Sequence, residues 1–375
     1  MKNILYSILA VVLVIGLVII IKNHTSSTND QKEIVIGAPL SLTGTAATDG
    51  LSIKRGIDLA VDDLAKQGVN VKVVYQDDAT DPKQTISAIN SIVATNSHVD
   101  ALIGPTWSFL LDASASTIDS DKIVSYSPAN TSEFIQSKSS YLFFGAIKNA
   151  YKVDATEQWL KDMNVHKVAI IVDKSAWGES VLAPYKIAAQ NAGVSVVLAD
   201  EVPFGAEADA YPTILAKMRS LGADGLLWTG YDEGGTILVQ KMQEMGMNIP
   251  LLAASTVLSG LVENHIVSIR PQDKMYYLTT DISLEFSQKF FQTYGSYPKT
   301  YSDSAYDGVM LLVQATRNKP AEMTLDQYLK SPDFHYTGYQ TDYSFDKNGD
   351  IKGGEWVVKQ LGTSSASTST STIPR

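Results

Sequence analysis

The chain has 375 residues, of which 45% are hydrophobic and 19% are charged, and this globular composition excludes global disorder. The formal net charge is −10 and no basic stripe occurs, which argues against a nucleic-acid-binding protein. The absence of cysteine excludes disulfides, thiolate nucleophiles, zinc–thiolate sites and a lipid anchor on an N-terminal cysteine.

The N-terminal segment, residues 1–22, predicts a membrane anchor. The stretch from Ile4 to Ile21 carries no charge, and Lys2 and Lys22 flank it. Its roughly 18 residues span roughly 27 Å as a helix, which is enough for the hydrocarbon core of a bilayer. A cleavable signal peptide is the alternative, but its apolar core is usually shorter and ends in a small-x-small site. We therefore expect an uncleaved signal anchor with the rest of the chain extracytoplasmic, or periplasmic or secreted if the segment is cleaved.

Two further segments lack the residues that a core needs. A polar linker covers 23–32, and the C-terminal segment 362–375 is rich in serine and threonine. Low complexity and few apolar residues predict a disordered tail there. The folded part is therefore expected to span 33–361.

Short β-branched runs alternate with helical periodicity in the first part of this region. Apolar positions from Ile53 to Leu64 repeat at helix spacing, as do those in 82–94. The expected strands lie at 34–36, 71–75, 101–103 and 123–126. This alternation predicts a mainly parallel sheet with helices on both faces.

The same alternation then restarts. The expected helices are 153–163, 179–191, 211–221 and 234–245, and the expected strands are 168–172, 194–198, 225–228 and 251–252. The sequence therefore predicts an α/β fold with two consecutive doubly wound units. Neither unit carries the glycine fingerprint of a dinucleotide site.

Ligands of doubly wound sheets bind beyond the carboxyl ends of the strands. The segments at these positions contain small hydroxyls, backbone amides, aromatic rings and a few acids, which is typical of binding a small polar molecule. No nucleophile, base and orienting group occur together, so we expect no enzyme and no cofactor. The five histidines are scattered without metal-ligand spacing, so we expect no metal site. The segments in question are 41–50, 104–108, 127–131, 173–178, 229–235 and 253–256.

The ordered set of post-strand segments resembles the leucine/isoleucine/valine-binding protein family. These are type I periplasmic solute-binding proteins that serve ABC transporters. The resemblance covers nearly all of 33–361. The segments that carry it are IGAPLSLTG (36–44), DDATDPKQ (77–84), LIGPTWS (102–108), SPANT (127–131), IIVDKSAWGE (170–179), TGYDEGG (229–235), YSDSAYDGV (301–309) and FDKNGDIKG (345–353).

The resemblance implies two three-layer α/β/α lobes joined by a three-strand hinge. Lobe 1 would hold 33–146 and 281–335, and lobe 2 would hold 147–280 and 336–361, with the third crossing near 336–343. Hinge closure would trap an amino acid or a related small polar molecule between the lobes. The expected function is that of the solute-binding protein of an ABC importer, whose partners are permease subunits. The alternative is a ligand-sensing receptor ectodomain of the same fold that is not coupled to a permease.

On the first lobe, the resemblance points to hydroxyl groups. Ser108 stands where family members contact the ligand carboxylate, and we expect its hydroxyl also to cap a helix. Thr131 matches a family threonine, and Asn130 replaces a small alanine. Trp107 and Asp49 are further candidates for the cleft wall. The alternatives are a plain helix cap for Ser108, turn chemistry for Asn130 and Thr131, core packing for Trp107, and a surface or cap position for Asp49.

On the second lobe, Trp177 stands where the family carries an aromatic ring that covers the ligand, with core packing as the alternative. Tyr231 and Asp232 fall on another position that reaches the ligand, with a helix cap as the alternative for Asp232. Ser255 lies where branched-chain amino-acid binders place a glutamate for the ligand ammonium. Because a buried ammonium needs a partner, either Asp232 or Asp49 supplies it, or the ligand has no α-ammonium.

Overall fold

The computed structural model describes residues 33–203, 205–263, 265–270 and 272–361. The predicted anchor, linker and tail lie outside the described residues. Within the described ranges, no helix is both long and apolar enough to cross a membrane.

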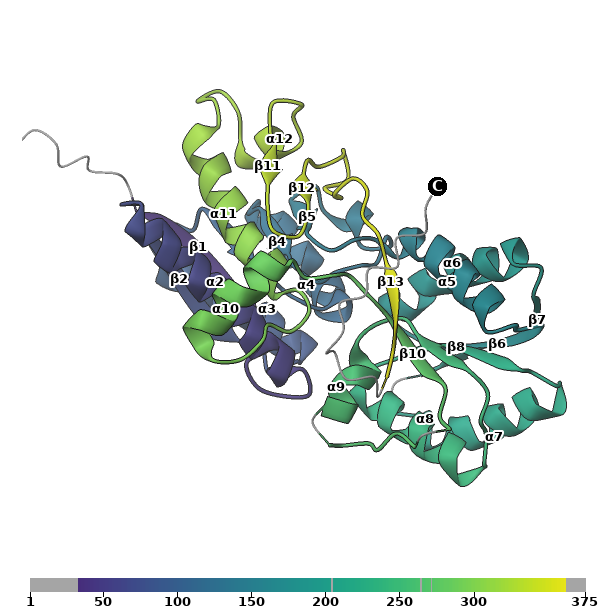
Figure 1. The fold of residues 1–375 in the computed structure, drawn as a ribbon. Helices are drawn as coiled ribbons and strands as arrows, with labels where there is room; N and C mark the ends of the chain where they lie inside the picture. Colours follow the sequence, from purple (N-terminus) through teal and green to yellow (C-terminus); the bar gives the residue numbers. More distant parts are fainter. Residues whose placement is uncertain (1–32, 204, 264, 271, 362–375) are drawn as a thin grey trace, which may run out of the picture.

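The first lobe is built on a five-stranded parallel sheet with the strand order β2-β1-β3-β4-β5 (Figure 1). Strand β1 (Ile34–Leu40) is buried along its whole length, which is why its sequence is almost entirely apolar. The other strands are β2 (Val71–Asp77), β3 (Ala101–Ile103), β4 (Ser125–Ser127) and β5 (Leu142–Phe144).

Helices cover both faces of this sheet. Ile53 and Ile57 of α2 pack in one core with α11, whereas Ile92 of α3 and Leu111 of α4 pack in another core on the opposite face. The helices of this lobe are α2 (Ala47–Lys66), α3 (Pro82–Thr95), α4 (Ser108–Asp121), η1 (Gln136–Lys138), α10 (Leu284–Tyr294), α11 (Ser302–Asn318) and α12 (Leu325–Leu329).

The second lobe is built on a six-stranded sheet with the order β13-β10-β9-β8-β6-β7. All neighbours pair in parallel except β13, which runs antiparallel to β10. Its strands are β6 (Lys167–Asp173), β7 (Ser195–Val202), β8 (Gly225–Thr229), β9 (Leu251–Ala253), β10 (Met275–Thr279) and β13 (Val357–Gln360). Its helices are η2 (Asn149–Lys152), α5 (Val153–Asp162), α6 (Ala176–Asn191), α7 (Glu207–Ser220), α8 (Asp232–Glu244) and α9 (Val257–Glu263).

The prediction of two consecutive βα-alternating units is confirmed, with two shifts that matter for the site. Helix α6 begins at Ala176 rather than Glu179, because the Ser175 hydroxyl caps it by accepting the backbone N–H of Gly178. Strand β7 runs on to Val202 instead of ending at residue 198.

The last part of the chain departs from the expected division. Strands β11 (Tyr336–Thr337) and β12 (Asp342–Tyr343) form a small sheet of their own. The Tyr343 ring lies 6.5 Å from that of Tyr126, and the Phe345 ring lies 5.1 Å from that of Phe143, both on the first lobe. The prediction that the third crossing lies at 336–343 is therefore wrong. The first-lobe core buries these rings, and the chain joins the second sheet only at β13.

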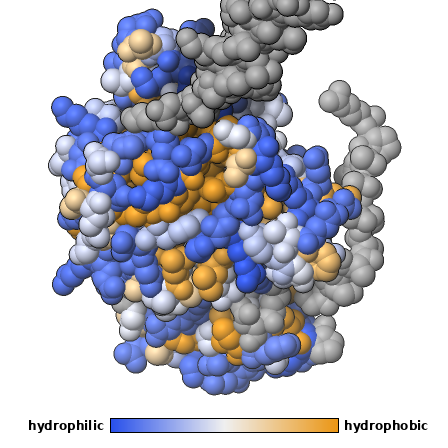
Figure 2. All heavy atoms as spheres, turned by 90° about the vertical axis from the view of Figure 1, so that its left-hand side faces the viewer, coloured by the Kyte–Doolittle hydropathy of each residue, from blue (hydrophilic) through white to orange (hydrophobic). Residues whose placement is uncertain are grey.

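The outer surface fits the composition. In the face shown in Figure 2, hydrophilic residues form most of the outline and apolar residues are exposed in separate patches between them. Such scattered apolar exposure is normal for a folded domain in water.

Candidate ligand-binding site

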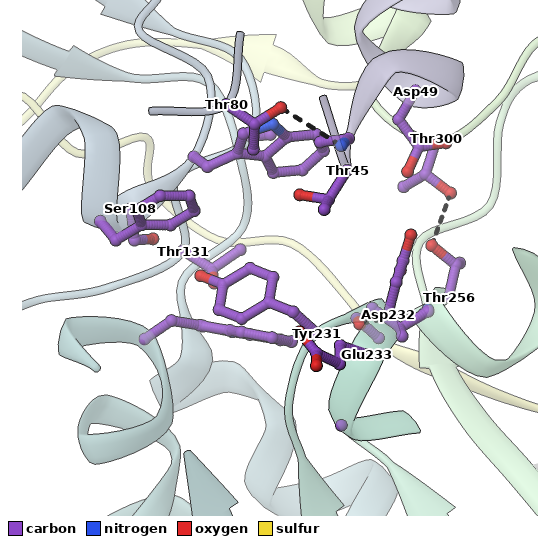
Figure 3. A pocket seen from close by; sticks show the side chains of 18 of the residues that line it. Thr45, Asp49, Thr80, Ser108, Thr131, Tyr231, Asp232, Glu233, Thr256 and Thr300 are labelled. Atoms are coloured by element: carbon purple, nitrogen blue, oxygen red, sulfur yellow. Dashed lines mark hydrogen bonds between the residues drawn. The ribbon is translucent and has the colours of Figure 1, made fainter. Parts of the chain in front are cut away.

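A cavity of about 410 Å³ lies between the two lobes. Its wall includes the ends of helices α2 and α4 from the first lobe and of α6 and α8 from the second (Figure 3). Helix N-termini and post-strand loops therefore converge on one space, as the doubly wound topology requires. A cavity of this size fits a small solute.

The structure brings eight of the nine predicted site residues to this cavity. Their common feature is a position in the loop or in the helix start that follows the carboxyl end of a strand. These residues are Asp49, Trp107, Ser108, Thr131, Trp177, Tyr231, Asp232 and Ser255.

The ninth, Asn130, lies behind the wall. It is fully buried, and its Oδ1 accepts hydrogen bonds from the Ser108 hydroxyl and from the backbone N–H of Ser132, the latter at 3.3 Å. Asn130 therefore positions Ser108 and does not itself line the cavity.

Ser108 does not cap its helix. The N-cap of α4 is Trp107, which makes no side-chain capping bond, and Ser108 is the first helical residue. Its hydroxyl proton goes to Asn130 instead. The prediction of a capping role for Ser108 is therefore wrong, although its backbone amide lies at the helix N-terminus, where an anion is favoured.

Aromatic rings form much of the second-lobe wall. Trp177 is 7% exposed and lies in the first turn of α6, with its ring 5.0 Å from that of Tyr231. Across the cleft, the ring of Phe109 lies 5.5 Å from that of Tyr231. Because Phe109 belongs to α4 of the first lobe, this edge-to-face contact joins the two walls.

Polar contacts also join the lobes. The Thr300 hydroxyl donates to the Thr256 hydroxyl at 3.4 Å, as the dashed line in Figure 3 shows. The Ser132 hydroxyl donates to the carbonyl of Ala176 at 2.8 Å. Both hydroxyls of the first contact line the cavity, and the second contact is made to the first residue of α6. The structure therefore represents a closed arrangement of the lobes.

Two carboxylates face each other across the cavity. Asp49 lies in the first turn of α2 and Asp232 is the first residue of α8, and Figure 3 shows them on opposite sides. Burial and, to a smaller extent, the charge of Asp49 together raise the pKa of Asp232 to about 6. The N-cap of α8 is Tyr231, so the capping alternative for Asp232 is wrong.

A second acidic pair lies at the base of the second-lobe wall. The pKa of Asp173 is raised to about 7, mainly by burial and in part by the charge of Glu207. The hydrogen bonds that Asp173 accepts from Ser175 and Gly178 lower the pKa and offset part of this rise. Glu207 lines the cavity, is 5% exposed, and has no hydrogen-bond partner for Oε2 among the described residues.

Ser255 occupies the place where the resemblance expects a glutamate. Its hydroxyl accepts the backbone N–H of Val257 at 3.4 Å, which is turn chemistry at the start of α9. The carboxylates of this wall come from other positions, at Glu207, Asp232 and Glu233.

Sequence reasoning missed several lining residues, among them Thr45, Phe109, Glu207, Thr256 and Tyr301. Glu207 was missed because β7 was expected to end before Val202, so that 203–207 was not recognised as a post-strand segment. Tyr301 has a φ of 70°, a left-handed backbone that is uncommon for tyrosine and that no local sequence signal announces.

No cluster of histidine, aspartate and glutamate with the geometry of a metal site occurs within 33–203, 205–263, 265–270 and 272–361. The cavity offers hydroxyls, carboxylates, backbone amides and aromatic rings. Groups of these kinds are suited to binding a polar solute by hydrogen bonds and by ring contact.

Comparison with known proteins agrees with this geometry. The family model described as "Periplasmic binding protein" matches residues 33–346. The Leu/Ile/Val-binding protein homolog 2 of Brucella abortus is 27% identical over 351 residues, which cover 87% of this chain and 90% of that protein.

Two solved structures share the fold. The leucine-binding protein LivK of Thermotoga maritima has a TM-score of 0.75 at 18% identity, covering 88% of this chain and 95% of that one. A solute-binding protein of an ABC transporter from Rhodopseudomonas palustris, in complex with 3,4-dihydroxybenzoic acid, has a TM-score of 0.72 at 19% identity, covering 88% and 93%. The two folds agree, while the ligands in their names are an amino acid and an aromatic acid.

The order of the strands, the cavity between the lobes and the match of the family model over most of the chain lead to one conclusion. The chain belongs to the periplasmic binding protein family, as an extracytoplasmic binding protein and not an enzyme.

Proposed function

We propose that this chain is the solute-binding protein of an ABC importer and takes up an amino acid or a related small polar molecule. The observation that carries the proposal is the cavity of about 410 Å³, which is walled by helix N-termini of both lobes and bridged by the contact between Thr256 and Thr300. A solute enclosed in this way is buried from both sides and is released only when the lobes separate.

The hinge is proposed to consist of three connections, near 143–149, near 277–281 and between Phe345 and Val357. The division into lobes around these connections follows the two sheets, apart from 336–351, which packs with the first lobe. Eight predicted residues that line the cavity are proposed to contact the solute, and Asn130 is proposed to act through Ser108.

The proposed attachment to the membrane is the uncleaved segment 1–22, which would hold the binding domain near its permease. Fractionation of cells that express the full chain tests this point. Recovery in the membrane pellet after alkaline extraction is expected, whereas a shortened soluble form would show cleavage.

Binding is tested by isothermal titration of the purified full chain, in detergent, with amino acids, amides and short organic acids. At least one solute is expected to bind one-to-one and to raise the melting temperature, because a ligand of the folded state stabilises it by mass action. Failure of every solute to bind would overturn the proposal. Deletion of the gene is then expected to abolish uptake of that solute, and unchanged uptake would favour the sensing alternative.

A further inference from the structure

The cavity has an uneven charge. Four of its lining residues are acids, namely Asp49, Glu207, Asp232 and Glu233, and none of the described lining residues is a lysine, arginine or histidine. A cavity shielded from water strengthens the interaction of these charges with whatever it encloses. An anion would meet repulsion there, and a cation would meet attraction.

Glu207 is the most deeply buried acid of this wall. Glu207 is only 5% exposed, and its Oε2 has no hydrogen-bond partner in the described part of the chain. It lies against the start of α8, where a Cβ atom on Gly234 would be 3.4 Å from the Glu207 Cγ. A buried carboxylate oxygen without a donor is costly, so a positive charge brought near Glu207 by the solute would lower the free energy of the complex by electrostatic attraction.

Ser108 presents an acceptor to the cavity. The Ser132 N–H fixes the orientation of the Asn130 amide by donating to Oδ1, and the Ser108 hydroxyl donates its single proton to the same oxygen. What remains on the Ser108 hydroxyl for a solute is therefore its lone pairs. A group rich in N–H donors satisfies them, and a carboxylate oxygen does not.

The rings beside the acids suit a cation as well. Trp177 and Tyr231 both line the cavity, and Tyr231 precedes Asp232 in the chain. The buried ammonium of Lys152 already lies 5.9 Å from the Trp177 ring, so Tyr231 is the ring left for a cation of the solute. The face of an aromatic ring attracts an ammonium or guanidinium group, and more strongly when water is excluded. Acids, an acceptor hydroxyl and rings are three independent features that favour the same ligand chemistry.

We propose that the solute carries a net positive charge, as a basic amino acid or a related amine, with its ammonium or guanidinium group against Asp232 and Glu207. This inference rests on the proposed function, because it specifies the solute of the same cleft. The N-terminus of α4 still offers backbone amides for a carboxylate at the other end of such a molecule.

The test compares solutes of like shape and different charge by titration into the purified full chain. Arginine is paired with citrulline, lysine with norleucine, and leucine and 4-hydroxybenzoate serve as solutes without net positive charge. The charged member of at least one pair is expected to bind about tenfold tighter than its neutral partner or more.

Two variants test which carboxylates lie against the positive charge of the solute. Asp232→Asn and Glu207→Gln are each expected to weaken binding of the cationic solute by about tenfold and to reduce the preference over its neutral partner. Asp209→Asn, which alters an exposed acid in the first turn of α7, is the matched control and is expected to bind as the unaltered protein does.

The outcomes separate the two proposals. Tighter binding of leucine or 4-hydroxybenzoate than of every cation would overturn the charge assignment and leave the binding function standing. Equal loss of cationic and neutral solutes in both variants would also overturn it, since the carboxylates would then be structural. Binding of no solute at all would overturn both.

Discussion

The two walls of the cleft differ in kind although both are built from the same βα units. The first-lobe wall presents hydroxyls at Thr45, Ser108 and Thr131 with one acid, Asp49. The second-lobe wall presents three acids, Glu207, Asp232 and Glu233, beside the edge-to-face rings of Trp177 and Tyr231. The difference teaches that the fold supplies the geometry, with helix N-termini on both sides, while the side chains at those termini decide what the cleft holds. One wall can be altered without the other, which gives the predictions below their controls.

The largest effect is expected from the glycines that bring each wall close to its strand. A Cβ atom at Gly50 would overlap the backbone oxygen of Ser41, and one at Gly178 would overlap that of Asp173. Gly50→Ala and Gly178→Ala are each expected to lower the free energy of unfolding by about 3 kcal/mol or more. Chemical denaturation measures this.

Gly260→Ala is the control for these two variants, because a Cβ atom there meets nothing within 4 Å. In helix α9 the change is expected to be neutral or stabilising by up to about 1 kcal/mol. If all three variants unfold alike, the close approach of the two walls to their strands is not as described.

Removing the ring of the second-lobe wall comes next. Trp177→Ala is expected to lower the free energy of unfolding by about 3 kcal/mol, since the side chain is 7% exposed. It is also expected to weaken solute binding about tenfold or more, because the cavity loses a ring surface. Trp177→Phe keeps part of the packing, so it is expected to restore more of the unfolding free energy than of the affinity for the solute. Full affinity in the alanine variant would show that the ring belongs to the core alone.

The acids of the second-lobe wall predict an unusual pH dependence. The pKa of Asp232 is raised to about 6 in the folded protein, above its ordinary 3.8, so the folded state binds more protons than the unfolded state between these values. Stability is therefore expected to fall as pH rises through about 6.

The contribution of this one group is isolated by a variant. Between pH 5 and pH 8, ligand-free protein is expected to lose about 1 kcal/mol more of its unfolding free energy than Asp232→Asn does. Asp119→Asn, at the exposed end of α4, should behave like the unaltered protein. Parallel pH profiles of Asp232→Asn and Asp119→Asn would contradict the burial of Asp232.

The smallest effect is expected at the hydroxyl of the first-lobe wall. Ser108→Ala removes a donor from Asn130 and an acceptor from the cavity, so we expect binding to weaken by about 1 kcal/mol, or roughly fivefold. Ser120→Ala on the exposed end of the same helix is the control. Titration that gives equal affinities for the two variants would remove Ser108 from the site.

The sequence predicted the two α/β units well because buried strands and helical periodicity are local patterns. The strand ends predicted the segments in which most of the site residues lie, since the ends of parallel strands meet at one edge, and the family resemblance pointed to the residues themselves. Trp177 was predicted from the resemblance as a residue just past a strand end. In the structure it lies in helix α6, whose start at Ala176 is set by the Ser175 cap.

What the sequence could not give depends on contacts between distant residues. The burial of Tyr343 and Phe345 against the first lobe is decided by Tyr126 and Phe143, far apart in the chain, and this moved the third crossing. The orientation of the Ser108 hydroxyl likewise depends on Asn130. Such choices are made by packing and not by local pattern.

The most direct test of the account is the distance between the lobes in solution. The chain has no cysteine, so Ser120→Cys on α4 and Ser220→Cys on α7 provide one exposed labelling site on each lobe. Pulsed electron paramagnetic resonance on the doubly spin-labelled protein is expected to show a broad distribution of distances without solute and a shorter, narrower one with a solute that binds. An unchanged distribution upon saturation with that solute would contradict closure of the cleft around it.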